Sequence, residues 1–202
     1  MPIYIILVYE DALSESVLEK LLSCFGSKYN IYQKYNGRGF GYIKANINGF
    51  NQACNTNPFL VLTDLDNASC PLEIIEAWFI KPINKNMIFR VAVKEVESWL
   101  LADIEGLSSF LSVSEANFPR SPEQEIDPKN TLISLAKKSR KRNIRKDIVP
   151  INDNAQIGPN YNGRLQEFIF TTWDIQRAIS RSDSLSRAYK SLENFEFSYN
   201  SK

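Results

Sequence analysis

Acidic residues follow three of the most apolar segments in this sequence. Glu10 and Asp11 follow IYIILVY, Asp64 and Asp66 close PFLVLTDLD, and Glu95 and Glu97 follow NMIFRVAVK. Two carboxylates about 4 Å apart repel each other by about 1 kcal/mol in water and about 4 kcal/mol at an effective dielectric constant near 20. A hard divalent cation relieves that repulsion, and oxygen ligands favour Mg²⁺ or Mn²⁺ over zinc or copper. The pattern therefore predicts a magnesium or manganese site.

The segments before these acidic residues have the composition of buried strands. Apolar or β-rich segments cover residues 3–9, 28–35, 58–64 and 86–93, and amphipathic helical patterns cover 12–25, 71–80 and 94–103. Strands that are apolar on both faces and alternate with helices are typical of a parallel sheet covered by helices on both sides. Ligands bind at the carboxyl ends of the strands in such sheets, so the acidic side chains should converge in one cleft.

Each acidic residue alone also has a structural explanation. Aspartate is favoured in turns and at helix N-caps, which would account for Asp11, Asp64 or Asp66. Glu95 and Glu97 fall in the expected first turn of a helix, where the helix dipole favours carboxylates. Three successive strands that all end in acidic residues are less easily produced by capping, so the joint pattern favours a functional site.

The composition narrows the possible chemistry. The chain of 202 residues contains no histidine, which excludes Ser-His-Asp triads, Cys-His dyads and imidazole-bound zinc. Its three cysteines are scattered and odd in number, which argues against a disulfide framework and for a reducing compartment. The N-terminal segment MPIYIILVYED lacks a basic leader, and no apolar run approaches the roughly 18 residues of a membrane span. We expect a cytoplasmic protein without a membrane segment.

The second half of the chain has a different character. Residues 104–202 contain short helical patterns and polar loops, with helices expected at 163–173 and 184–195. The segment 137–146 carries seven basic residues, namely Lys137, Lys138, Arg140, Lys141, Arg142, Arg145 and Lys146. The formal net charge is only +1, so any basic surface is local. Basic runs are often solvated surfaces; the functional alternative is contact with the phosphate backbone of a nucleic acid.

Three stretches of the first half resemble a known family. VYEDALSESVLEKLL, LVLTDLD and VKEVESWLLAD are similar to a family of small bacterial Toprim-like proteins, related in fold to the Toprim nucleases of the overcoming-lysogenization-defect type. The resemblance covers residues 1–103 and implies a Toprim-like (Rossmann-like), mostly parallel α/β sheet flanked by helices. Residues 104–202 would then form a C-terminal helical extension that carries the basic segment.

The resemblance also assigns roles to residues. Glu10 matches the Toprim glutamate, Asp64 and Asp66 match the Asp-x-Asp pair, and Glu97 matches the acidic residue before Trp99. The four would be metal ligands, with Glu10 and Glu97 also catalytic; Glu10 could instead be a general base, and Glu95 or Glu15 could replace Glu97. Lys94 would stabilise charge on the phosphate, although it also fits a solvated helix start.

The implied activity is Mg²⁺- or Mn²⁺-dependent cleavage of phosphodiester bonds in a nucleic acid. The resemblance further implies an ATPase partner within a bacterial anti-phage defence system. An alternative is a catalytically degenerate Toprim module that binds a partner protein or nucleic acid, which is favoured by Asp11 at a position where Toprim domains usually have glycine. Response-regulator receivers and haloacid-dehalogenase phosphatases also place acidic residues at strand ends, but their strand order matches less well.

Overall fold

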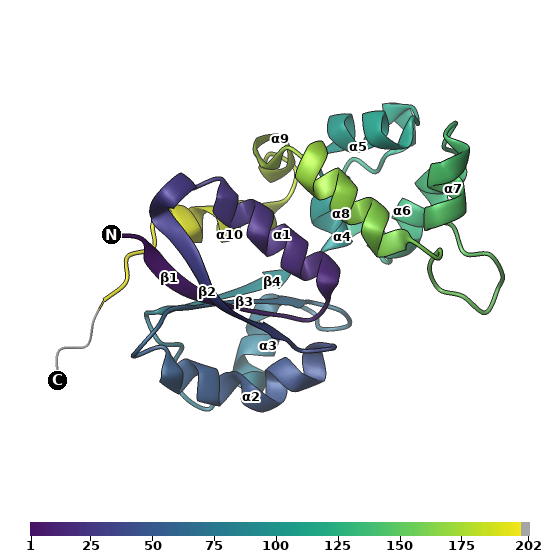
Figure 1. Ribbon diagram of the computed structural model, residues 1–202. Helices are drawn as coiled ribbons and strands as arrows, with labels where there is room; N and C mark the ends of the chain where they lie inside the picture. The colour runs from purple at the N-terminus through teal and green to yellow at the C-terminus, as the bar shows by residue number, and fades with distance from the viewer. Residues whose placement is uncertain (199–202) are drawn as a thin grey trace. The chain divides into compact units, whose positions relative to one another are not determined.

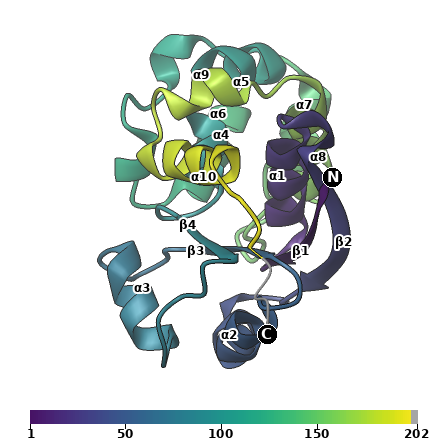
Figure 2. The ribbon, with the colours of Figure 1, turned by 90° about the vertical axis from the view of Figure 1, so that its left-hand side faces the viewer.

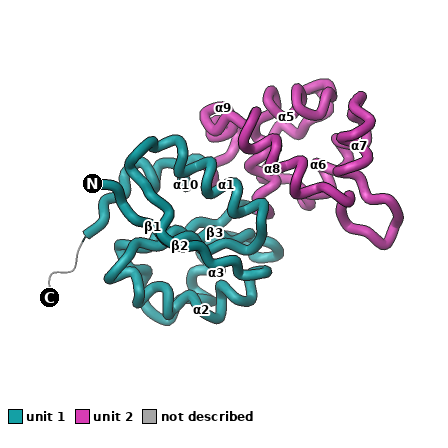
Figure 3. The backbone as a smooth tube through the Cα atoms, in the orientation of Figure 1, with its two compact units in different colours: residues 1–93, 186–202 teal, residues 94–185 magenta. Residues whose placement is uncertain are grey.

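The computed structural model describes residues 1–198, which form two compact units (Figures 1 and 3). Unit 1 consists of residues 1–93 together with the chain from residue 186 onward, and unit 2 consists of residues 94–185. The sequence placed the boundary at residue 103 and assigned the whole C-terminal part to a helical extension. The structural division differs because the last helix returns to the α/β unit.

A four-stranded parallel sheet forms the centre of unit 1. The strands are β1 (Ile3–Tyr9), β2 (Tyr29–Asn36), β3 (Phe59–Asp64) and β4 (Met87–Ala92), in the order β2-β1-β3-β4. All three pairings are parallel, which confirms the predicted α/β fold class. The two central strands, β1 and β3, are buried over most of their length because helices cover both of their faces.

Helices cover each face of this sheet. Helix α1 (Ala12–Ser23) and the C-terminal half of α10 (Asp183–Glu193) lie on one face, and α2 (Phe40–Ala53) and α3 (Pro71–Trp78) lie on the other (Figures 1 and 2). Lys28, which precedes β2, and Tyr29, the first residue of β2, tie α10 to the sheet. Lys28 Nζ and the Tyr29 hydroxyl each donate a hydrogen bond to the carbonyl of Leu192, at 2.9 and 2.5 Å.

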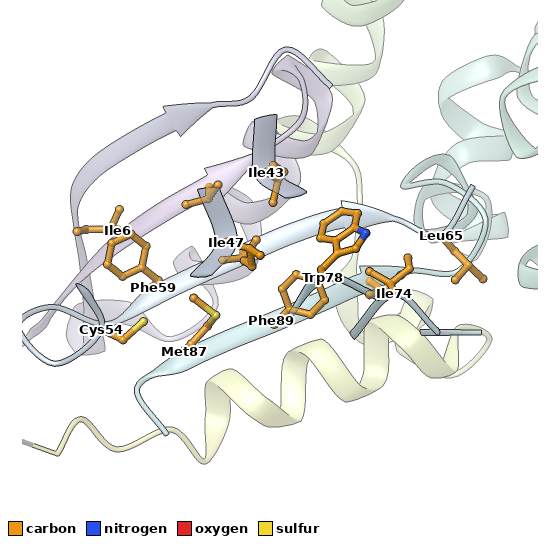
Figure 4. Close-up of a cluster of buried hydrophobic side chains, with 13 residues drawn as sticks. Ile6, Ile43, Ile47, Cys54, Phe59, Leu65, Ile74, Trp78, Met87 and Phe89 are labelled. Carbon is orange, nitrogen blue, oxygen red and sulfur yellow. The ribbon is translucent and has the colours of Figure 1, made fainter. Parts of the chain in front are cut away.

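One apolar core of unit 1 lies between the sheet and helices α2 and α3 (Figure 4). Trp78 of α3 meets Phe89 of β4 edge to face, with ring centroids 6.0 Å apart. Leu65, which directly follows β3, is buried in the same cluster. Alternate residues of β4, including Phe89, face this core, so the residues between them face α10.

Unit 2 is helical throughout its described residues. Its helices are α4 (Glu97–Leu101), α5 (Ile104–Leu111), α6 (Pro128–Lys137), α7 (Arg142–Ile148), α8 (Tyr161–Thr171), α9 (Ile175–Ile179) and the first turn of α10, with short 3₁₀ turns at Glu115–Asn117 and Pro122–Gln124. A third 3₁₀ turn, Gly26–Lys28, lies in unit 1. Among the described residues, no helix is both long enough and apolar enough to cross a membrane.

Candidate functional site

The strand order of unit 1 changes direction between β1 and β3. From β1 the chain moves to β2 on one side, and it then crosses to β3 on the other side of β1. In open parallel sheets, ligands bind outside the carboxyl ends of the strands at such a switch point. Glu10 directly follows β1 and Asp64 is the last residue of β3, so these two predicted site residues flank the switch point.

A pair of hydrogen bonds fixes the Glu10 carboxylate at this position. Oε1 of Glu10 accepts one hydrogen bond from the Thr63 hydroxyl and another from the backbone N–H of Asp64, at an N···O distance of 2.9 Å. Both bonds use the same oxygen, and within residues 1–198 no hydrogen bond reaches Oε2 of Glu10. The end of β3 therefore orients the carboxylate and leaves one of its oxygens for a ligand.

The electrostatic environment of Glu10 favours a cation. Burial raises the pKa of the Glu10 carboxyl above its ordinary value, and the negative charges of Asp66 and Asp11 raise it further. The hydrogen bonds from Thr63 and Asp64 act in the opposite direction. A bound cation would stabilise the ionised form against both the burial and the neighbouring carboxylates.

The Asp-Leu-Asp segment is shaped by its central residue. Leu65 is buried among the apolar side chains above α3, and its backbone N–H donates to the carbonyl of Ala92 at 2.9 Å. Asp64 is half-buried, whereas Asp66 is exposed and takes a left-handed backbone conformation with φ of 48°. The anchored leucine thus holds two carboxyl-bearing residues at the end of β3.

Asp11 has a structural role that its position predicted. It is the N-cap of α1, and its side chain accepts a hydrogen bond from the N–H of Ser14 at 2.8 Å. Its φ of −148° is extended backbone, which any residue adopts. This position therefore does not require the glycine that is usual in Toprim domains.

The loop between β2 and α2 also contributes to this edge of the sheet. The N–H of Gly37 donates to the carbonyl of Tyr9 at 2.7 Å, and the N–H of Gly39 donates to the carbonyl of Glu10 at 3.0 Å. A Cβ on Gly37 would lie 3.0 Å from the Gly39 carbonyl oxygen, and Gly39 has φ of 108°. The loop therefore holds the backbone at Arg38 next to that of Glu10, and the Arg38 residue is exposed. The sequence alone gave Arg38 no role in the acidic site. The two glycines flanking an arginine were the available signal.

Glu97 lies in unit 2, where it has partners of its own. Only 2% of the residue is exposed, and Oε1 accepts a hydrogen bond from the Tyr161 hydroxyl at 3.0 Å. Lys129 Nζ lies 3.5 Å from the same oxygen. Burial raises the pKa of Glu97 to about 7; the charge of Lys129 opposes the rise, and that of Glu95 adds to it. The predicted role of Glu97 as a metal ligand and catalytic residue stays a prediction.

Lys94, the first residue of unit 2, is half-buried and has a left-handed backbone conformation with φ of 65°. L-residues other than Asn and Asp adopt this conformation rarely, and it often marks a turn or a functional site. The predicted role of Lys94 in stabilising charge on a phosphate stays a prediction.

Part of the basic segment 137–146 stabilises unit 2 itself. Lys138 Nζ donates to the side-chain oxygen of Asn117 at 2.9 Å, and Lys141 Nζ donates to the carbonyl of Phe110 at 2.9 Å. The guanidinium of Arg145 donates to the carbonyl of Ser139. These three cations therefore have structural partners within unit 2, which neither interpretation of the run predicted.

The remaining basic residues of the segment are exposed: Lys137, Arg140, Arg142 and Lys146. An open hollow of about 430 Å³ is lined by Lys137, Arg142, Arg145, Lys146, Val149, Pro150 and Ile151. It gathers basic side chains from the end of α6 and from α7. Contact with a nucleic-acid backbone stays a prediction for this segment.

The oxygen ligands at the edge of the sheet suit a hard metal ion. Within residues 1–198, no three Asp, Glu, Cys or His side chains are grouped closely enough to hold a metal by themselves. Mg²⁺ usually keeps several water molecules and binds through one or two carboxylates plus substrate oxygens. Glu10, Asp64 and Asp66 are the residues that would supply those carboxylates.

The Glu10 carboxyl should titrate above the ordinary range of glutamate. Replacing Thr63 by valine removes a hydrogen bond to the ionised carboxylate, so we expect the Thr63→Val variant to raise the pKa of Glu10 further. Carbon-detected NMR of ¹³C-labelled glutamate side chains in EDTA measures this pKa. A Thr171→Val variant, which removes an exposed hydroxyl in unit 2, should leave it unchanged. A Glu10 pKa at or below 4.5 would contradict the geometry.

The resemblance to small Toprim-like proteins stays a prediction from the sequence, since no protein-family model, curated protein or solved structure matches this chain.

Proposed function

We propose that this chain is a Mg²⁺- or Mn²⁺-dependent nuclease whose metal site lies at the carboxyl ends of β1 and β3. The observation that carries the proposal is the Glu10 carboxylate. It is held across the switch point by Thr63 and Asp64, keeps one oxygen without a hydrogen bond from residues 1–198, and is repelled by Asp66. A carboxyl group with a raised pKa at the carboxyl ends of parallel strands is typical of functional sites.

The residues of the edge have separate roles in this proposal. One or two of the carboxylates of Glu10, Asp64 and Asp66 would bind the metal, with water and substrate oxygens as the other ligands. The metal, when bound, polarises a phosphoryl oxygen and lowers the pKa of a bound water. The hydrogen bonds from Thr63 and from the Asp64 backbone keep the Glu10 carboxylate oriented before substrate arrives. Arg38 attracts the phosphate of the substrate, because its exposed guanidinium lies on the loop that is bonded to Glu10.

The proposed function also gives roles to residues of unit 2. Glu97 and Lys94 are further candidates for the reaction, as the resemblance implies. The exposed cations of the 137–146 segment bind the nucleic-acid backbone without regard to sequence, which makes binding sensitive to salt. This attraction is useful because an acidic metal site alone repels a polyanion.

The resemblance also supports a place in a bacterial anti-phage defence system beside an ATPase. The sequence contains no phosphate-binding loop of the G-x-x-x-x-G-K-[ST] type. In this proposal the ATPase partner hydrolyses the nucleotide. The main alternative is a degenerate module that only binds, and Asp11 in place of the glycine usual in Toprim domains favours it.

Replacing Asp64 and Asp66 together by asparagine should abolish metal-dependent cleavage. Asparagine keeps the size of the side chain but removes the negative charges, so we expect a loss of at least about 100-fold in cleavage rate. Supercoiled plasmid and single-stranded DNA and RNA are incubated with the purified chain and Mg²⁺ or Mn²⁺. Asp153→Asn, at an exposed aspartate of unit 2, is the matched control and should retain wild-type activity.

Calorimetry with Mn²⁺ separates the possible failures of this experiment. Mn²⁺ binding that disappears in the double variant, without cleavage by the isolated chain, would support the metal site and point to a required partner. Absence of both cleavage and Mn²⁺ binding would contradict the nuclease proposal, and the degenerate module would then be the better description.

A further inference from the structure

A single arginine interrupts the apolar strand β4. Phe89 and Val91 of this strand belong to the core against α2 and α3 (Figure 4). Successive side chains of a strand alternate between the two faces of the sheet, so Arg90 faces the other side, toward α10. Ile88, on the same face as Arg90, is only 3% exposed. An arginine at such a position requires compensation for the loss of water.

The residues around Arg90 compensate only in part for its loss of contact with water. Nε of Arg90 is buried and has no hydrogen-bond partner within the described part of the chain. No carboxylate of residues 1–198 lies within ion-pairing distance of its guanidinium. A buried donor without an acceptor typically costs about 1–3 kcal/mol. An anion bound to the outer part of the guanidinium would offset part of this cost through its charge.

A second cation adds to the positive potential around Arg90. Burial lowers the pKa of Arg90, and the charge of Arg187 on α10 lowers it further. Arg187, Ser191 and Asn194 are spaced by four and three residues, so they lie on one face of the helical segment. This face brings a positive charge together with hydroxyl and amide donors.

Arg90, Ser191 and Asn194 line a pocket of unit 1 that opens to solvent, and Arg187 is not among its lining residues. The β4–α10 pocket has a volume of about 410 Å³ and is lined by Lys85, Met87, Ile88, Arg90, Ser191, Asn194, Phe195 and Glu196. β4 is an edge strand, so no further strand covers it on this side. Glu196 is the one carboxylate of the lining, against the cations of Lys85 and Arg90.

We infer that the β4–α10 pocket is a binding site for a phosphate oxyanion, separate from the acidic edge of the sheet. A phosphate is small enough for the pocket and accepts hydrogen bonds from planar guanidinium groups with good geometry. Arg90 and Lys85 provide positive charge at the pocket, and Arg187 adds a neighbouring positive charge. Ser191 and Asn194 line the pocket with neutral polar groups, and the Asn194 amide also donates to the carbonyl of Lys190 at 2.9 Å. The phosphate comes either from the free ion or from a nucleic-acid backbone.

Titration with inorganic phosphate tests this inference directly. In ¹⁵N-labelled protein, the arginine Nε–Hε resonance of Arg90 should shift and saturate as phosphate is added at constant ionic strength. Arg90→Met and Arg187→Met should each weaken phosphate binding by about tenfold or more. Arg120→Met, at an exposed arginine of unit 2, is the matched control and should bind phosphate as the wild type does. Arg187 is exposed, so its variant remains informative if Arg90→Met does not fold.

A second arm with single-stranded oligothymidylate identifies the source of the phosphate. If Arg187→Met weakens oligonucleotide binding and lowers its salt dependence by about one counterion, the pocket takes a backbone phosphate. If oligonucleotide binding is unchanged while phosphate binding is lost, the pocket takes a free phosphate. An Arg90 resonance that does not respond to phosphate, or equal phosphate binding by Arg187→Met and Arg120→Met, would overturn the inference. The result does not depend on the nuclease proposal, because neither probe requires cleavage or a metal.

Discussion

Replacing Arg177 by methionine should lower the free energy of unfolding by about 3 kcal/mol. Asp103 of unit 2 is fully buried, and Arg177 binds its carboxylate with both arms of the guanidinium, at 2.7 Å from Nε and 2.9 Å from the terminal nitrogen. Methionine keeps much of the aliphatic stem but leaves a buried charge without its cation. We take the lower end of the usual range because the Arg177 side chain is 34% exposed. Urea-induced unfolding followed by circular dichroism measures the change.

The surroundings of Asp103 limit how far the fold can adapt to this loss. The backbone N–H groups of Gly106 and Asp174 also donate to the Asp103 carboxylate, at 3.1 and 2.8 Å. A Cβ on Gly106 would lie 2.2 Å from Oδ2 of Asp103, so the carboxylate is closely enclosed. Arg181→Met removes an exposed arginine nearby in sequence and should change stability by less than about 0.5 kcal/mol. A similarly small change in Arg177→Met would contradict a structural role for the pair.

The role of Asp103 illustrates a limit of the sequence. The segment VKEVESWLLAD carried part of the resemblance, yet its last residue, Asp103, received no role. Its partner Arg177 is 74 positions further along the chain. No local pattern connects the two residues, because their contact depends on how the helices of unit 2 pack. The structure explains the aspartate as part of a buried ion pair.

The strands were predictable because a strand that is buried on both faces forms a run of apolar residues in the sequence. Segments such as Ile3–Tyr9 and Phe59–Asp64 consist almost entirely of apolar residues, and the structure confirms them as parallel strands. The boundary between the units was not predictable in the same way. Residues 186–193 look like any amphipathic helix, and their return to the first unit depends on contacts with Lys28 and Tyr29.

The acidic site at the carboxyl ends of β1 and β3 was only partly predictable from the sequence. The order of acidic residues after strands placed Glu10 and Asp64 at one edge of the sheet, and their hydrogen bond in the structure agrees with that expectation. The contribution of Thr63 was hidden, because a threonine inside a strand usually indicates β-propensity alone. Arg38 stood out in the sequence only as a charge among aromatic residues, and it received no role in the acidic site because the glycine loop that carries it matches no nucleotide-binding pattern. Contacts such as that of Thr63 with Glu10 depend on the residue at which each strand ends.

Glu97 should make the stability of the protein depend on pH between about 4.5 and 7. Burial raises its pKa in the folded protein to about 7, against an ordinary value of 4.5. Between these two values the folded state retains a proton that the unfolded state releases. Its stabilising contribution is therefore fully present below pH 4.5 and is lost as the pH rises through 7. The shift corresponds to about 3 kcal/mol in the free energy of unfolding.

Glu97→Gln should remove this pH dependence. Glutamine is always neutral and still offers an oxygen to the Tyr161 hydroxyl, so the variant resembles the protonated glutamate of the wild type. Unfolding free energies are measured by urea titration between pH 4.5 and pH 8 in EDTA, so that no divalent cation stabilises the carboxylate. The wild type should lose about 2–3 kcal/mol more than Glu97→Gln over this range. Glu115→Gln, at an exposed glutamate of unit 2, should behave as the wild type. Parallel pH profiles for the wild type and Glu97→Gln would show that Glu97 is ionised in the fold despite its burial, and its charge would then have to be balanced by Lys129, 3.5 Å away.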